Sequence, residues 1–204
     1  LVKRCQFYPL PVAKLLAKCL YSGHSARFEA SSGSMPVPNE LSYVLRGHHG
    51  PINTVRFNKN GKYCMTCGHD RTIRLWNPHR SGVERAEEAL LIKTYSGPHG
   101  KEVRDVCITQ DNNRFASCGG DKSVFVWDVA SGKVIKKYQG HDHRVNAVKF
   151  NKDDTVLVSA GYDKKICTWD LRSHAWTPIQ TMSHCKDSIT SLQVTDALII
   201  AGSV

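Results

Sequence analysis

Short runs of alternating apolar and polar residues fill the chain from about residue 41 onward, with clusters of turn-forming residues between them. The clearest four runs are KVIKKYQ (133–139), RVNAVKF (144–150), TVLVSAG (155–161) and KICTW (165–169). A period of two in short runs that contain β-branched and aromatic residues predicts β-strands. The Gly, Asn and Asp residues between the runs favour tight turns. Because no long helical periodicity interrupts this pattern, we expect an all-β fold of short antiparallel strands.

Three copies of one motif follow each other along the chain. CGHDRTIRLWNPHRSG starts at Cys67, CGGDKSVFVWDVASGK at Cys118 and AGYDKKICTWDLRSHA at Ala160. In each copy an Asp lies six residues before a Trp, a Ser or Thr lies four residues before that Asp, and a His lies 28 residues before the Trp. The three sets are His48, Thr66, Asp70 and Trp76; His99, Ser117, Asp121 and Trp127; and His141, Ser159, Asp163 and Trp169. A set repeated at fixed spacing indicates one structural unit that is used several times.

These motifs resemble the WD-repeat (WD40) family over roughly residues 41–204. The resemblance implies a β-propeller, in which each blade is a four-stranded antiparallel sheet. It also implies that each set of four residues is a structural tetrad, in which the Asp orients the His and the His reaches the hydroxyl group and, through it, the indole N–H. The twelve residues are therefore expected to hold the blades together and not to take part in a reaction.

The repeats divide residues 35–204 into about three and a half blades, with approximate bounds 41–77, 93–128, 136–170 and an incomplete 181–204. Seven blades of about 42 residues would need roughly 300 residues. The sequence therefore favours a partial propeller from a longer protein.

Two segments depart from the repeat pattern. Residues 1–34 are basic and poor in acidic residues, and we expect a leader or a disordered tail there. Their apolar run, VAKLLAKCL, is too short to span a membrane. The distance between the first two Trp residues of the repeats is 51 residues instead of 42, and the excess lies in the charged, Ala-rich segment 81–92. We expect this insertion to be a surface loop.

Composition changes this picture little, because 41% hydrophobic and 23% charged residues are ordinary for a globular protein. Cys64 and Cys67 form a CxxC motif, but odd spacing on a strand turns the two side chains to opposite faces, which argues against a metal site. Cys107 and Cys167 also fall in expected strands and are interpreted as buried free thiols, typical of a reducing compartment. The cysteines thus predict a reducing compartment, and the family resemblance described below implies a cytoplasmic and nuclear protein.

Nothing in the sequence predicts catalysis or a cofactor. His141 and His143 in GHDHR could form a metal pair, but His141 already belongs to a repeated set. No phosphate-binding glycine loop, nucleophile elbow or zinc-hydrolase helix is present in the sequence. The net charge of +10 could attract phosphorylated proteins or RNA, but the basic residues are spread through strands and turns without interleaved aromatic residues. We expect a solvated surface without direct sequence-specific nucleic-acid binding.

Longer stretches resemble the N-terminal half of one branch of the WD-repeat family, the mitogen-activated protein kinase organizers. They include GGDKSVFVWDVASGKVIKKYQGHDHRVNAVKFN (119–151) and SAGYDKKICTWDLRSH (159–174). The resemblance implies a scaffold whose partners are kinases of a mitogen-activated cascade, in a family also associated with splicing factors, the spliceosome and pre-mRNA splicing. The chain departs from the family pattern at the insertion, at Pro98 within a Gly-His pair, at Asn77 in place of the terminal Asp, and in its missing blades.

An alternative function remains open at the end of the third repeat. LVSAGYDKKICTWDLR (157–172) fits the WDxR box with which some propellers bind cullin-RING ubiquitin ligases as substrate receptors. Arg172 would then be the contact residue, whereas it would otherwise be a solvated turn residue.

Overall fold

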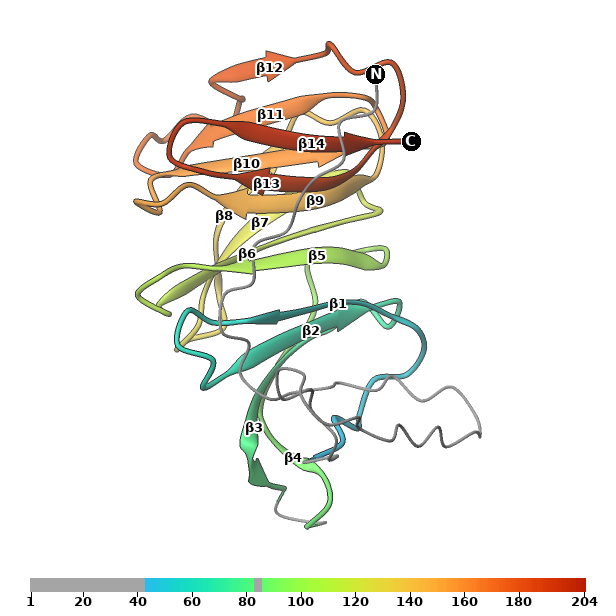
Figure 1. The fold of residues 1–204 in the computed structure, drawn as a ribbon, viewed down its shortest axis with the longest axis vertical. Coiled ribbons are helices and arrows are strands. Elements are labelled where there is room, and N and C mark those ends of the chain that lie inside the picture. The colour runs from blue at the N-terminus through green and yellow to red at the C-terminus, as the bar shows by residue number, and fades with distance from the viewer. Residues whose placement is uncertain (1–42, 83–85) are drawn as a thin grey trace, which may run out of the picture.

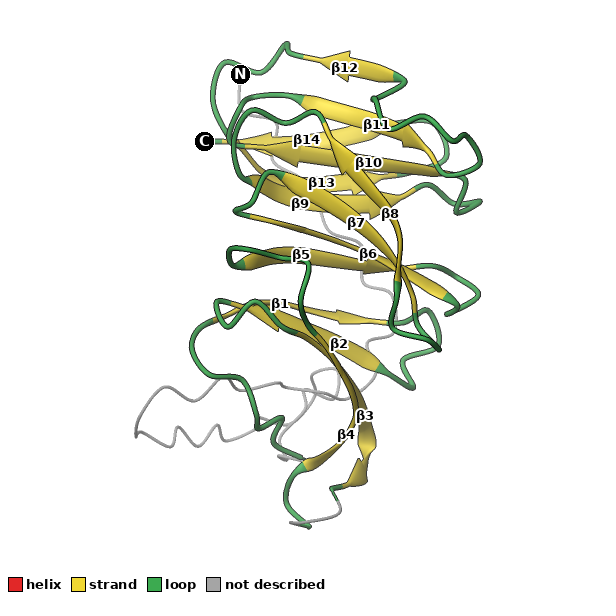
Figure 2. Ribbon diagram, turned by 180° about the vertical axis from the view of Figure 1, so that it is seen from behind, coloured by secondary structure: helices red, strands yellow, loops and turns green. Residues whose placement is uncertain are grey.

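The computed structural model describes residues 43–82 and 86–204, which contain fourteen β-strands and no helix (Figure 2). They form three four-stranded antiparallel sheets and one two-stranded sheet, placed side by side (Figure 1). The first sheet contains β1 (Ile52–Phe57), β2 (Cys64–Gly68), β3 (Ile73–Ser81) and β4 (Ala89–Tyr95). The second contains β5 (Val103–Ile108), β6 (Arg114–Gly119), β7 (Ser123–Asp128) and β8 (Val134–Gln139). The third contains β9 (Val145–Phe150), β10 (Val156–Gly161), β11 (Ile166–Asp170) and β12 (Gln180–Met182), and the last contains β13 (Ile189–Val194) and β14 (Ile199–Ser203).

Each sheet is a simple meander, because spatial order follows sequence order in all four. The first strands of successive sheets, β1, β5, β9 and β13, are neighbours. This is the arrangement of propeller blades around an axis, with β4, β8 and β12 at the outer edge. The expected all-β partial propeller is thus confirmed, with three four-stranded blades and two strands of a fourth.

The segment 81–92, which we expected to be a surface loop, is partly β-strand. β3 continues to Ser81 and β4 starts at Ala89, so part of the segment extends a hairpin. The physical reason is the apolar content of its second half, since Ala89 is buried in one cluster with Cys64 and Trp76. Residues 83–85, like residues 1–34, lie outside the described part of the chain. Within that part, no helix could cross a membrane.

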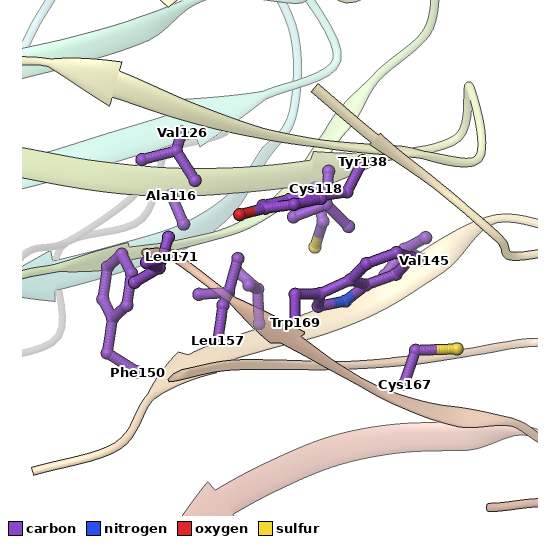
Figure 3. Close-up of a cluster of buried hydrophobic side chains, with 12 residues drawn as sticks. Ala116, Cys118, Val126, Tyr138, Val145, Phe150, Leu157, Cys167, Trp169 and Leu171 are labelled. Carbon is purple, nitrogen blue, oxygen red and sulfur yellow. The ribbon is translucent and has the colours of Figure 1, made fainter. Parts of the chain in front are cut away.

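Aromatic side chains from the outer strand of one blade pack on the Trp of the next blade. The Tyr138 ring on β8 stacks on Trp169 of the third blade at a centroid distance of 5.0 Å, and its hydroxyl donates to the Asp170 carbonyl at 3.1 Å (Figure 3). In the same way Tyr95 on β4 contacts Trp127 edge-on at 6.0 Å. A repeated aromatic contact of this kind makes each blade depend on its neighbour for its core.

Polar contacts also join the inner strands of neighbouring blades. Asp105 on β5 is 2% exposed, and its carboxylate lies 2.9 Å from the Arg56 guanidinium on β1 and 3.4 Å from the Lys149 ammonium on β9. It also accepts a hydrogen bond from the Val148 backbone N–H at 3.2 Å. One buried carboxylate therefore connects three blades, and its partners satisfy the charge that burial would otherwise penalise.

Candidate functional site

The four residues of the first repeated set form one continuous hydrogen-bond chain. His48 lies in the loop before β1, and its Nδ1 atom is 2.8 Å from Asp70 Oδ2 in the turn between β2 and β3. The other ring nitrogen, Nε2, is 2.7 Å from Thr66 Oγ1 on β2. The Trp76 indole on β3 donates to the same hydroxyl oxygen at 2.8 Å. Two strands, the turn between them and the loop before β1 are connected through these side chains.

The second and third sets repeat this geometry closely. In the second blade the distances are 2.9, 2.8 and 2.8 Å for His99–Asp121, His99–Ser117 and Trp127–Ser117. In the third blade they are 2.9, 2.8 and 2.8 Å for His141–Asp163, His141–Ser159 and Trp169–Ser159. The structure thus brings together all twelve side chains that the spacing singled out. Pro98 does not disturb the second set, since His99 makes the same contacts as its counterparts.

Each Asp of these sets also fixes the backbone of two loops. Asp121 accepts hydrogen bonds from the backbone N–H groups of Gly100 and Ser123 at 3.3 and 3.2 Å. Asp70 and Asp163 bind the equivalent backbone groups of their own blades. The residue after each Asp has a positive φ of 63 to 66°, which a tight turn requires: Arg71, Lys122 and Lys164. When the imidazole is neutral and protonated on Nδ1, every donor in the chain has one acceptor, whereas a protonated imidazole donates from both ring nitrogens, to the Asp and to the hydroxyl oxygen.

The histidines of the first and third sets have different pKa values, and the residue at one neighbouring position contributes to the difference. Arg74, Phe125 and Cys167 occupy the same place on the third strands β3, β7 and β11. Burial, with a smaller effect of the nearby Arg74 charge, lowers the pKa of His48 despite its bond to Asp70. Burial also opposes protonation of His141, but the hydrogen bonds with Asp163 and Cys167 outweigh it and raise the pKa to about 9.

The other polar candidates are not brought together into a reactive cluster. In residues 43–82 and 86–204 no group of three or more His, Cys, Asp or Glu side chains could hold a metal ion. His143 packs its ring against Tyr162 at 4.7 Å, away from the hydrogen bonds of His141. Cys64 and Cys67 are both buried free thiols. Burial raises the pKa of Cys64 to about 12, which disfavours the thiolate form needed for metal binding or nucleophilic attack.

Arg172 lies just after β11, on the surface. Its side chain is 76% exposed, and its Nε atom is 3.4 Å from Asp170 Oδ1. The Asp170 carboxylate also accepts the Arg172 backbone N–H at 2.8 Å, which fixes the turn. The guanidinium is therefore presented to solvent from a defined backbone position.

Sequence reasoning missed the residues that join one blade to the next. Lys93 and Lys136 on the outer strands donate to backbone carbonyls of the following blade, beside Tyr95 and Tyr138. The sequence does contain a repeated pattern for these residues, KTY at 93–95 and KKY at 136–138. Each triplet precedes the third strand of the next blade by the same number of residues. Asp105 has no such signal, because its counterparts at the same place on β1 and β9 are Thr54 and Ala147.

Comparison with known proteins identifies the repeat and related chains. The family model for the WD domain, G-beta repeat, matches residues 39–77, 90–128 and 132–170. WD repeat domain-containing protein 83 from Xenopus tropicalis is 45% identical over 168 residues, covering 82% of this chain and 51% of the relative. The protein of the same name from Rattus norvegicus is 46% identical over 168 residues, covering 82% and 50%. The chain thus spans about half the length of these curated relatives.

A solved structure is similar in fold. The crystal structure of the WD40 beta propeller domain of Doa1 aligns with a TM-score of 0.68 at 26% sequence identity, covering 81% of this chain and 52% of that one.

Replacing Asp121 with Ala is expected to lower the free energy of unfolding by about 2–4 kcal/mol, because His99 Nδ1 and two backbone N–H groups lose their acceptor. Chemical unfolding followed by tryptophan fluorescence measures this. Asp153→Ala is the control, since Asp153 is exposed and its loss should change stability by less than about 0.5 kcal/mol. Equal effects of the two substitutions would contradict a structural role for Asp121.

The two histidines are expected to titrate far apart, His141 near pH 9 and His48 below pH 6.5. The raised pKa of His141 contributes stability that is fully present below pH 6.5 and is lost as the pH rises through about 9. The lowered pKa of His48 has the opposite sign, so its contribution is lost as the pH falls below 6.5. NMR titration of the imidazole Cε1–H signals measures both. Cys167→Ala should lower the pKa of His141 and leave His48 unchanged, whereas two histidines titrating together would refute this account.

Proposed function

Because the chain belongs to the WD40-repeat family, we propose that it acts as a non-catalytic scaffold on which other proteins assemble. The observation that carries this proposal is that the repeated polar residues bind one another within each blade. The hydroxyl groups of Thr66, Ser117 and Ser159 are fully buried, and each is bound to one His and one Trp. Side chains that could serve in acid–base chemistry are used to fix loops, which leaves the exposed surfaces to bind partners.

The partners that we propose are kinases of a mitogen-activated cascade and splicing factors. This finer assignment is supported by the resemblance of residues 119–151 and 159–174 to the kinase organizers of the family. It concerns the whole protein, because this chain spans only about half of its relatives. Such partners would require the protein to be present in both the cytoplasm and the nucleus. We expect no cofactor and no direct sequence-specific contact with nucleic acid.

A second function, substrate receptor of a cullin-RING ubiquitin ligase, is favoured by one observation. Arg172 is 76% exposed and held by a turn two residues after the Trp-Asp pair of the third repeat. An exposed arginine of this kind can bind a carboxylate of a partner through two parallel hydrogen bonds.

Affinity purification of the tagged protein from RNase-treated lysate, with quantitative mass spectrometry, tests the scaffold proposal. We expect several kinases of one cascade to be recovered together in amounts that exceed a tag-only control. Recovery of splicing factors in their place would assign the main role to a nuclear ribonucleoprotein. Recovery of neither group would refute the assigned partners.

Substitution of Arg172 by Ala separates the two functions. If the ligase function holds, binding to the purified ligase adaptor should fall by at least about tenfold, which corresponds to one lost charged contact. The fold should be unaffected, since the side chain is mostly exposed. Arg71→Ala is a matched control, because Arg71 is also an exposed turn arginine but lies between β2 and β3. Adaptor binding that is absent, or equal in all variants, rules out the ligase function.

A further inference from the structure

A cavity of about 240 Å³ opens to the surface between the first and second blades. Its walls are apolar side chains from both blades, including Met65, Leu75, Ile92, Ile108 and Val129. The side chains of Asn58 and Asn112 close one side through a hydrogen bond of 2.9 Å across the two blades.

The same positions are buried between the second and third blades. Ile108 and Phe150 are the last residues of the inner strands β5 and β9, and Val129 and Leu171 directly follow the third strands β7 and β11. Phe150 and Leu171 are 8% and 7% exposed and belong to one compact cluster (Figure 3). Ile108 and Val129 remain partly exposed. Apolar surface is therefore exposed between the first and second blades, whereas the equivalent surface between the second and third blades is buried.

Ile92 forms part of the outer wall and has a direct counterpart. Both Ile92 on β4 and Ile135 on β8 are the extra residue of a bulge, where the pairing with the third strand skips one position. They are 45% and 48% exposed. They differ in their surroundings, since Ile92 lines the cavity between the first two blades.

The size of the cavity indicates what could occupy it. An apolar cavity of roughly 150 Å³ is already large enough to hold benzene. Complete small-molecule sites are usually larger, about 300–1,000 Å³. A space of 240 Å³ that is open to solvent therefore suits one large apolar side chain of a bound peptide, as in the anchor pockets of protein interfaces.

The charged residues near the cavity indicate which residues of a bound peptide would flank such an anchor side chain. Lys59, Lys62 and Lys93 are each next in sequence to a residue that lines the cavity. The Lys59 ammonium donates to Gln110 Oε1, and the Lys93 ammonium donates to the Val129 and Ala130 carbonyls; these uncharged acceptors leave both positive charges in place. The acidic neighbours are Asp111 and Asp128, and both are engaged within their own turns. Asp111 accepts hydrogen bonds from Thr109 and Asn113, and Asp128 accepts one from Ser131. These hydrogen bonds leave both carboxylates negatively charged, so the sequence neighbours of the cavity lining include three ammonium groups and two carboxylates, and their net charge is positive.

We infer that the cavity between the first two blades is a docking site for an acidic segment of a partner protein, with one Leu or Phe side chain as its anchor. The inference deepens the proposed scaffold function and rests on it, because it gives one surface for one class of partner. The peptide backbone would lie along the rim, with its carboxylates facing the lysines.

The Met65 methyl group is a direct probe of this site, because it lines the cavity and the chain has only three methionines. We would label the full chain with ¹³C at the methionine methyl groups and titrate it with the peptide Asp-Glu-Asp-Leu-Glu-Asp. The Met65 signal should shift to saturation, while Met182 in the third blade should not respond. Versions of the peptide with Gly in place of Leu, or with Lys in place of every acidic residue, should bind at least about tenfold more weakly.

Two matched variants distinguish binding in the cavity from nonspecific binding to the protein surface. Ile92→Ser should weaken binding of the acidic peptide by about tenfold, since it removes one apolar wall. Ile135→Ser, at the equivalent bulge, should bind like the unaltered chain. Both residues are about half exposed, so both variants should fold, and thermal unfolding verifies this.

Three results would overturn the inference. They are no Met65 shift at millimolar peptide, equal binding of the Leu and Gly peptides, and equal loss in the two Ser variants. A Met65 shift that depends on protein concentration without peptide would also overturn it, because a second copy of the chain would then fill the cavity. Partner purification tests the scaffold role separately, so failure of peptide binding alone leaves that role intact.

Discussion

The hydrogen-bond chain from Asp through His and Ser or Thr to Trp is the interaction on which each blade depends. A blade of four short strands buries little apolar surface alone, and its loops contain backbone N–H groups that need acceptors. The Asp supplies these acceptors and also orients the His, so one carboxylate fixes the loop before the first strand and the turn after the second. Loss of one member leaves buried donors unpaired, which costs more than the hydrogen bond contributes when formed.

Contacts between blades add a second level of dependence. The Trp that completes the chain in one blade is covered by an aromatic side chain from the outer strand of the preceding blade, as Tyr138 covers Trp169. Inner strands are joined by Asp105, which has partners in the blades before and after it. Stability in such an array is a sum of the stability of each unit and of its contacts with neighbours. The surfaces proposed to bind partners therefore depend on the whole array, and no single repeat produces them.

Sequence periodicity was sufficient to predict the fold class and to select the twelve side chains that the structure brings together, because both follow from local spacing within one repeat. It was insufficient for contacts between repeats. Asp105 stands where the neighbouring inner strands have Thr54 and Ala147, so no repeat pattern marks it. The segment 81–92 was interpreted as a loop because of its charges, whereas burial of Ala89 beside Trp76 extends the hairpin. Both cases depend on which surfaces meet in space, which a one-dimensional pattern does not contain.

The departures from the repeat are more informative about function than the repeat itself. Positions that are the same in every blade are explained by the fold, since every blade must provide hydrogen-bond partners for its buried polar groups. Positions that differ change the properties of one blade only. Burial lowers the pKa of His48, to which the Arg74 charge adds, whereas hydrogen bonds with Asp163 and with Cys167, at the place equivalent to Arg74, raise that of His141. Ile108 and Phe150 occupy another; Ile108 borders an open cavity, whereas Phe150 is buried in a hydrophobic cluster. A propeller of similar blades can thus acquire distinct surfaces without any change in its framework, and it is at such positions that partner specificity is expected to lie.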